Sequence, residues 1–160
     1  MLRFFHNMIS CPKLFKKSQK GFTLIELLVV IGILAVLLSI VLIAINPARQ
    51  FGQANNTKRQ SDVGAILNAV GAYSADNKGQ LPAGITTTSQ AVSKAAADIC
   101  ANLVPTYISA LPTDPSLNTA AITDCSSSYA TGYTIIKDAN GRVTVTAPTT
   151  DNGAVITVQR

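Results

Sequence analysis

The feature that most constrains this chain is an uncharged apolar run near its N-terminus, from Leu27 to Ile45. Only Gly32 and Ser39 interrupt its aliphatic residues and alanines. As an α-helix rising about 1.5 Å per residue, the run is nearly as long as the ~30 Å hydrocarbon core of a bilayer is thick. It is too long for the apolar part of an ordinary secretory signal peptide. The run therefore predicts a transmembrane helix over residues 22–45.

The charges that flank this run predict its orientation. The residues before Phe22 include no acid but several bases, namely Arg3, Lys13, Lys16, Lys17 and Lys20. Basic residues after the run are more thinly spaced. Because positively charged flanks tend to stay in the cytoplasm, we expect residues 1–21 inside and residues 46–160 outside. The precursor would then be a single-pass protein of the inner (cytoplasmic) membrane.

The net charge of +5 belongs to this N-terminal leader, because the rest of the chain balances eight bases against its eight acids. A protein that binds nucleic acid through phosphates needs an excess of positive charge. The balance over residues 22–160 therefore argues against nucleic acid as a partner. Lys58 and Arg59 form a local basic pair, which we expect to lie on a solvated helix face.

One acid, Glu26, lies inside the apolar block. A carboxylate in a bilayer is costly unless it is shallow or paired. Two interpretations are open: Glu26 reaches water at the membrane edge, or it has a dedicated cationic partner. Its own helix offers no such partner, because the next basic residue, Arg49, is a membrane thickness away. A cation would have to come from the leader side or from another subunit.

The segment from Lys20 to Ala35, KGFTLIELLVVIGILA, resembles the class III signal of type IV pilins and pseudopilins. The basic leader, Gly21, Phe22 and a glutamate at the fifth position after Gly21 are all in register. The resemblance implies that a prepilin peptidase cuts between Gly21 and Phe22 and methylates the new amine of Phe22. It also implies that Glu26 pairs with the Phe22 amine of a neighbouring subunit during assembly. In a low dielectric such a pair is favoured over two isolated charges, and it disfavours any other register.

A second helical segment follows the apolar run. Asn46-Pro47 predicts a break, because proline removes a helical hydrogen bond and Asn-Pro is typical of an N-cap followed by a first turn. We expect the long helix to break near Pro47 and to continue over residues 48–77. An apolar face recurs there at spacings of three and four, formed by Val63, Ile66, Leu67, Val70 and Tyr73. This half of the helix is therefore predicted to be amphipathic.

Residues 78–127 are predicted to be mainly irregular. We expect a short helix over 89–97, and a second one capped by Asp98 that ends before Pro105. The turn-rich LPTDP at residues 111–115 resembles the Leu-Pro-x-Asp-Pro of pilins and of the major pseudopilin of type II secretion systems. Cys100 and Cys125 lie in the part expected outside the cytoplasm, where an oxidising compartment favours a disulfide. Such a bond could stabilise the fold by roughly 3 kcal/mol.

The C-terminal part predicts three strands, over residues 133–136, 142–147 and 154–158. The alternation of valine and threonine in the second strand is typical of a half-buried strand. A sheet this small has to bury its apolar face on the amphipathic helix. The predicted fold class is therefore α+β: a long N-terminal helix, transmembrane in its first half, packed on a small three-stranded antiparallel sheet. Three parts are expected: a cleaved leader (1–21), a transmembrane or filament-core helix (22–45) and a head outside the cytoplasm (46–160, with strands in 128–160).

The sequence offers little for catalysis. The only histidine is His6, in the leader, so a mature chain could not build a Ser-His-Asp or Cys-His apparatus. We expect no enzyme activity, no cofactor and no metal. Asp114 and Asp124 could be compared with calcium ligands of the major pseudopilin family, but hard cations need several oxygen ligands. We expect both to be solvated loop acids.

These observations predict a structural subunit of a type IV pilus filament. Its partners would be further copies of itself, other pilins, prepilin peptidase, the assembly platform of the inner membrane and, before assembly, lipid. The LPTDP segment instead favours a pseudopilin, in a short periplasmic filament. The expected disulfide and the lack of a clear calcium loop favour the pilin. A minor pilin that binds DNA or a surface, and a monomeric one-span anchor, are further alternatives.

Overall fold

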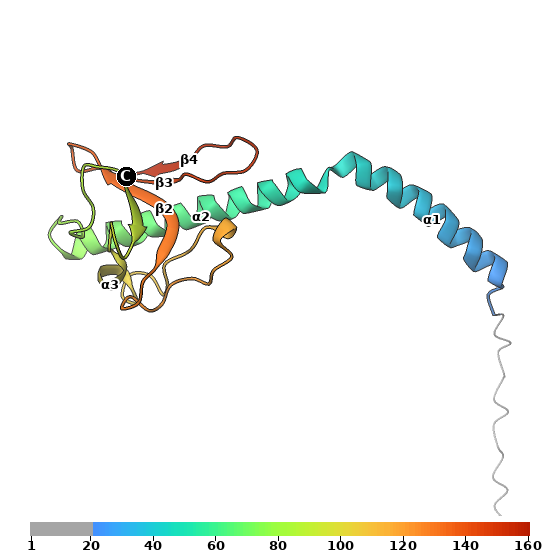
Figure 1. The fold of residues 1–160 in the computed structure, drawn as a ribbon, viewed down its shortest axis with the longest axis horizontal. Helices are drawn as coiled ribbons and strands as arrows, with labels where there is room; N and C mark the ends of the chain where they lie inside the picture. Colours follow the sequence, from blue (N-terminus) through green and yellow to red (C-terminus); the bar gives the residue numbers. More distant parts are fainter. Residues whose placement is uncertain (1–20) are drawn as a thin grey trace, which may run out of the picture. The chain divides into compact units, whose positions relative to one another are not determined.

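The computed structural model describes residues 21–160, which fall into two compact units, one ending at Ala44 and one over Ile45–Arg160 (Figure 1). The leader predicted over residues 1–21 lies outside the described residues except for Gly21.

The N-terminal unit contains helix α1, Leu24–Ile45, which has 22 residues. None of its side chains is buried. It is the one helix among residues 21–160 that is long and apolar enough to cross a membrane. A helix that is apolar on every side and covered by none of the described residues is suited to lipid or to other apolar helices.

Helix α2, Pro47–Asp76, begins directly after Asn46. Asn46 has a left-handed backbone with φ 47°, and its side-chain oxygen accepts a hydrogen bond from the backbone N–H of Arg49. Pro47 occupies the first turn, where its missing N–H costs nothing. The structure therefore contains the N-cap and first-turn pair predicted from Asn46-Pro47, and α1 and α2 are separate helices.

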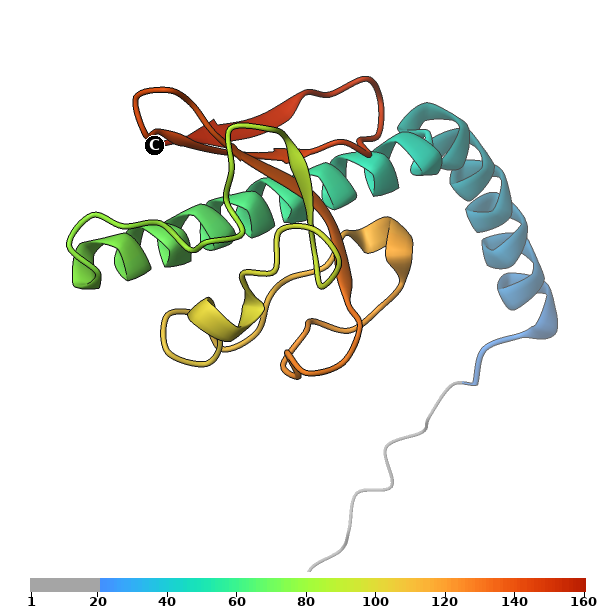
Figure 2. The same cartoon turned by 60° about the vertical axis from the view of Figure 1, so that its left-hand side comes forward.

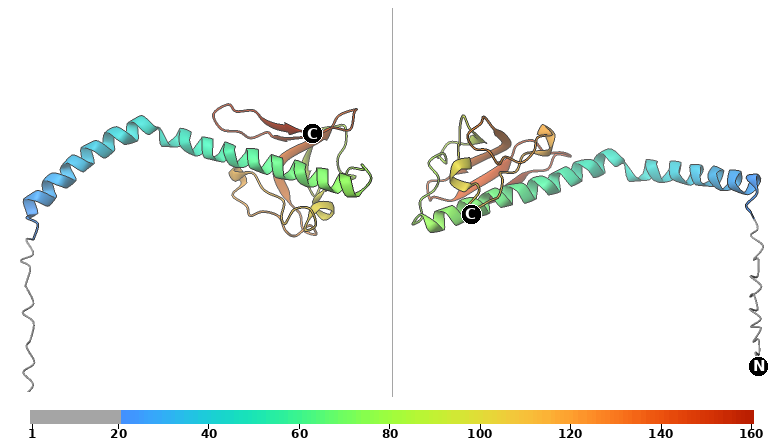
Figure 3. Two further views of the ribbon diagram at one scale, coloured as in Figure 1. Left: turned by 180° about the vertical axis from the view of Figure 1, so that it is seen from behind. Right: turned by 90° about the horizontal axis from the view of Figure 1, so that it is seen from below.

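Four antiparallel strands form the sheet of the second unit, in the order β1-β2-β3-β4. They are β1 (Gln90–Ser93), β2 (Ala130–Lys137), β3 (Val143–Ala147) and β4 (Ile156–Gln159). Helix α2 runs along one side of this sheet (Figures 2 and 3). The predicted α+β fold of a long helix and an antiparallel sheet is confirmed, with one strand more than predicted.

The additional strand corrects the helix predicted over 89–97. Gln90 pairs with Ile135, and Val92 is completely buried in the core. A four-residue segment has little helix propensity of its own to oppose the hydrogen bonds of a neighbouring strand, so tertiary pairing decides its structure.

The core lies between α2 and the sheet. Val63, Ile66, Leu67 and Val70 are buried, as the spacing on α2 predicted, while Tyr73 is only half-buried. Two short helical turns complete the unit, α3 (Cys100–Leu103) and the 3₁₀ turn η1 (Pro115–Leu117). Asp98 does not cap α3, because Ile99 occupies that position without a side-chain hydrogen bond.

Candidate processing and assembly site

The segment that precedes α1 is accessible. Gly21, Phe22 and Thr23 have no regular secondary structure, and Phe22 is 82 % exposed. A side-chain carbon added at Gly21 would meet nothing within 4 Å. The fold itself therefore does not require glycine before Phe22, and the bond between the two residues is open to an enzyme.

Thr23 and Glu26 form a capping box at the start of α1. The Glu26 carboxylate accepts hydrogen bonds of 2.8 Å from both the backbone N–H and the hydroxyl of Thr23. In return, the Thr23 hydroxyl oxygen accepts a 3.2 Å bond from the Glu26 N–H. This reciprocal pattern satisfies backbone donors that an α-helix leaves free at its N-terminus.

The capping box changes the interpretation of Glu26. The sequence predicts no cation for this carboxylate in its own helix, and residues 21–160 contain no ion pair to Glu26. Thr23 instead supplies two neutral donors. The signal was present in the sequence, because threonine followed three residues later by glutamate before an apolar run is typical of a capping box.

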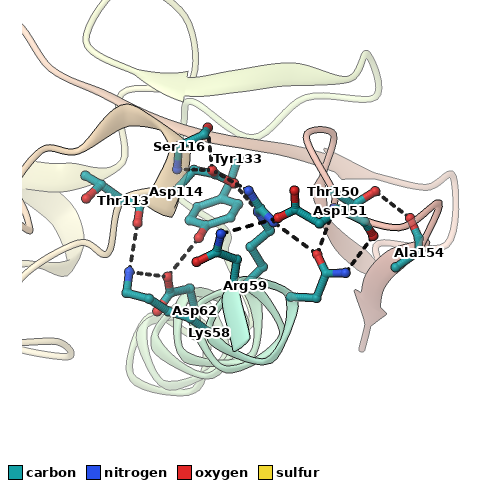
Figure 4. A network of polar contacts seen from close by, with 12 residues as sticks. Lys58, Arg59, Asp62, Thr113, Asp114, Ser116, Tyr133, Thr150, Asp151 and Ala154 are labelled. Atoms are coloured by element: carbon teal, nitrogen blue, oxygen red, sulfur yellow. Dashed lines mark hydrogen bonds and ion pairs between the residues drawn. The ribbon is translucent and has the colours of Figure 1, made fainter. Parts of the chain in front are cut away.

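A second cluster of functional interest is centred on Arg59 of α2, which is only 2 % exposed (Figure 4). Its guanidinium donates to both carboxylate oxygens of Asp114, over 2.8 Å from Nε and over 3.1 Å from Nη2. Asp114 is itself 1 % exposed. A bidentate arginine–carboxylate contact of this kind is among the stronger side-chain interactions in proteins.

The predictions that Arg59 and Asp114 are solvated are therefore wrong. Arg59 is seven residues after Gly52 and four before Val63, so all three lie on the face of α2 that meets the rest of the unit. Gly132 of β2 explains how Asp114 approaches closely: an added side-chain carbon there would lie 2.8 Å from the Asp114 Cβ. An arginine in a helical apolar face can thus indicate a buried partner on a distant loop.

Arg59 also holds the β3–β4 loop, defined here as residues 148–155. Its guanidinium donates to Asp151 over 2.7 Å. Asn56 exchanges two hydrogen bonds with the backbone of Asp151, of 2.7 Å and 3.0 Å. Gly52 allows this approach, because an added side-chain carbon would lie 2.6 Å from the Asn152 amide nitrogen. One helix face thus fixes two loops that are far apart in sequence.

The contacts with Arg59 determine the charge state of Asp114 and Asp151. Burial raises the pKa of the Asp114 carboxyl, but the hydrogen bonds from Arg59 and Ser116 outweigh burial and hold that pKa below its usual range. The hydrogen bond from Arg59 also lowers the pKa of Asp151. Both carboxylates therefore stay ionised at neutral pH, and the cluster combines one cation with two anions.

A neighbouring set of contacts continues the network on the same helix. Lys58 pairs with Asp62 over 3.1 Å and donates to the Thr113 carbonyl oxygen over 3.0 Å. The Tyr133 hydroxyl donates to Asp62 over 2.8 Å, and burial together with Asp62 raises the pKa of Tyr133. The LPTDP segment is thus held through its Thr113 and Asp114, and the Lys58–Arg59 pair is occupied by intramolecular contacts.

Asp124 differs from Asp114. It is exposed, and its carboxylate accepts hydrogen bonds from Ser126 and Ser127, which lower its pKa to about 2. Among residues 21–160 there is no group of three or more histidine, cysteine or acidic side chains placed to hold a metal ion. Asp114 is already bound by Arg59, so these two aspartates do not come together as a cation site.

Cys100 and Cys125 are joined by a disulfide. Around it, Tyr129 accepts a hydrogen bond from the Cys100 N–H and donates one of 2.8 Å to Asp98. Lys94 pairs with Asp98 over 2.9 Å and donates to the Cys125 carbonyl oxygen. The hydrogen bond to Lys94 lowers the pKa of Asp98 despite partial burial. The disulfide therefore anchors the long irregular segment between β1 and β2.

Comparison with protein families places the prokaryotic N-terminal methylation motif at residues 16–42. The chain thus carries the class III signal of type IV pilins and pseudopilins, as the resemblance of Lys20–Ala35 indicated. The motif supports a type IV pilin-like or pseudopilin precursor, and the exposed apolar α1 is consistent with membrane anchoring of that precursor. No curated protein and no solved structure showed significant similarity to the chain.

Proposed function

We propose that this chain is a structural subunit of a type IV pilus, made as a single-pass inner-membrane precursor and not an enzyme. Prepilin peptidase cuts between Gly21 and Phe22 and methylates the Phe22 amine. The mature subunit then joins a helical homopolymer through α1. The observation that carries the proposal is the methylation motif in register with an apolar helix that buries none of its side chains within residues 21–160.

The proposed assembly step uses the capping box. In the membrane, Thr23 supplies donors to the Glu26 carboxylate, which lowers the cost of placing a charge among apolar groups. Cleavage then creates a cationic amine at Phe22. A neighbouring subunit that enters with the correct stagger places its amine beside Glu26, and any other stagger leaves a charge unpaired. Glu26 thereby selects the register of the filament.

The stability of the second unit supports the proposal, because subunits of a filament outside the cytoplasm have to stay folded there. The buried Arg59–Asp114 pair and the Cys100–Cys125 bond each tie an irregular loop region to a regular element.

A second candidate is the major pseudopilin of a type II secretion system, with a short periplasmic filament. The observation that favours it is the LPTDP segment at 111–115, which is built into the fold through Leu111 and Asp114. Under that alternative the processed chain remains with the cell envelope and is not released by shearing.

The test compares Glu26→Gln with Glu26→Leu in cells that assemble the filament. Glutamine keeps an oxygen that can accept from Thr23 but removes the charge, whereas leucine removes both. We expect both variants to insert and to be cut before Phe22, and both to lose filaments. Normal filament yield from Glu26→Gln would contradict the register role of the charge. Loss with leucine alone would reduce Glu26 to a helix cap.

A further inference from the structure

The start of α2 is exposed on every side. Residues 47–51 are all exposed, and Gly52 is the first buried residue of the helix. Phe51 is 71 % exposed, and no residue of the described chain covers it. Burial of a phenylalanine is favourable, so an aromatic ring left uncovered at a fixed place suggests a contact outside the chain.

This exposed segment directly follows the apolar helix. Arg49 is four residues and Phe51 six residues beyond Ile45. Because Asn46 is not helical, the chain from Ile45 spans at most about 10 Å to Arg49 and about 13 Å to Phe51. The headgroup layer beyond each side of the hydrocarbon core is about 5–8 Å thick. If α1 spans the membrane, Arg49 and Phe51 therefore lie in the headgroup layer or just beyond it, whatever direction α2 takes.

A shallow hollow beside Arg49 has the chemistry of an anion contact. Asn46, Ala48, Arg49 and Asn152 line it, and none of them is acidic. Asn46 turns its oxygen to the Arg49 N–H. Asp151 precedes the lining residue Asn152 in sequence, but its carboxylate is paired with the Arg59 guanidinium. The lining therefore combines one arginine with two asparagines and includes no acid, which suits a phosphate group.

The hollow draws on two distant parts of the chain. Asn152 belongs to the β3–β4 loop, and its amide donates to the Arg49 carbonyl oxygen over 3.4 Å. The bonds from Asn56 and Arg59 to Asp151 hold the loop in this place. The loop therefore accompanies the start of α2 and does not depend on α1 for its position.

We propose that Asn46, Arg49, Phe51 and Asn152 form a membrane-proximal surface that contacts phospholipid headgroups of the outer leaflet before assembly. Arg49 binds a lipid phosphate, and the Phe51 ring lies at the membrane interface, as aromatic residues do. The inference rests on the proposed membrane insertion of α1. Continuity with that helix favours lipid over a second copy of the chain.

The experiment uses the absence of tryptophan from the whole sequence. Phe51→Trp in the full chain gives a single fluorescent probe, placed in lipid nanodiscs at one copy per disc. Phospholipids brominated near the headgroup end or near the tail end of the acyl chains serve as quenchers of known depth. Leu42→Trp is the control inside the apolar helix. Asn140→Trp, exposed at the β2–β3 turn, is the control at the far end of α2.

We expect the Phe51→Trp emission to be blue-shifted and quenched mainly by the shallow bromines, and Asn140→Trp to be unquenched. Adding Arg49→Glu should weaken the quenching of the tryptophan at position 51. A water-like, unquenched emission at position 51 beside a quenched Leu42→Trp would overturn the inference alone. So would shielding that appears only with two copies per disc, which would assign the surface to a second subunit. An unquenched Leu42→Trp would overturn the membrane insertion on which both proposals rest.

Discussion

Replacing Arg59 by alanine should destabilise the second unit strongly. The change leaves the Asp114 carboxylate, which is 1 % exposed, without its cation. Breaking a buried ion pair by removing one partner typically costs about 3–5 kcal/mol, because an uncompensated charge remains. The contact with Asp151 adds little, since that side chain is 41 % exposed and such pairs are worth about 1 kcal/mol or less.

The measurement is urea unfolding of the full chain in detergent, followed by tyrosine near-ultraviolet circular dichroism. All four tyrosines lie in the second unit, so the signal reports its unfolding and not that of α1. Lys58→Ala is the matched control, because Lys58 is the adjacent residue and its side chain is 53 % exposed. We expect that control to lose about 1 kcal/mol or less.

The difference in the free energy of unfolding between wild type and Arg59→Ala should also depend on pH. The folded pKa of Asp114 is below its unfolded value, so its contribution is present above that unfolded value and is lost as pH falls through the folded pKa. Without Arg59, burial acts to raise the pKa of Asp114 in the variant. The difference between wild type and Arg59→Ala should therefore begin to shrink above about pH 4 and shrink further below it. A loss under about 1 kcal/mol at neutral pH for Arg59→Ala would refute the argument.

Three further predictions concern local packing. Gly52→Ala should displace the β3–β4 loop and cost about 1–3 kcal/mol in the same unfolding assay. Gly64→Ala should be neutral or stabilising, because an added side-chain carbon there meets nothing within 4 Å. Equal effects of the two substitutions would contradict the packing described. Replacing Cys100 and Cys125 together by serine should cost about 3 kcal/mol, and unchanged stability would show that the bond does not constrain the unfolded chain. Thr23→Val should cost about 1 kcal/mol of helix stability, read as faster amide exchange in the first turn of α1, while Thr23→Ser should preserve protection; equal exchange in both variants would exclude the capping box.

Patterns with a strong local cause were predictable from the sequence. The apolar run fixed the span of α1, and Asn46-Pro47 specified the boundary between two helices. The alternation in residues 143–147 gave β3. In each of these cases the residues that carry the signal are neighbours, so propensity and periodicity are sufficient.

What could not be predicted depends on distant partners. Strand β1 forms because β2 offers it hydrogen bonds, and its own four residues do not favour a strand strongly. The sequence predicts a solvated Arg59 because its partner Asp114 is 55 positions away. The capping box between Thr23 and Glu26 is different, because its signal is local and can be found in the sequence.

Intact-mass spectrometry of filaments sheared from cells that express this chain tests the proposed processing and assembly directly. We expect a subunit that begins at an N-methylated Phe22 and lacks two hydrogens for the Cys100–Cys125 bond. A processed chain that remains with the cell envelope would favour the pseudopilin. An uncut chain that still carries residues 1–21 would contradict the account.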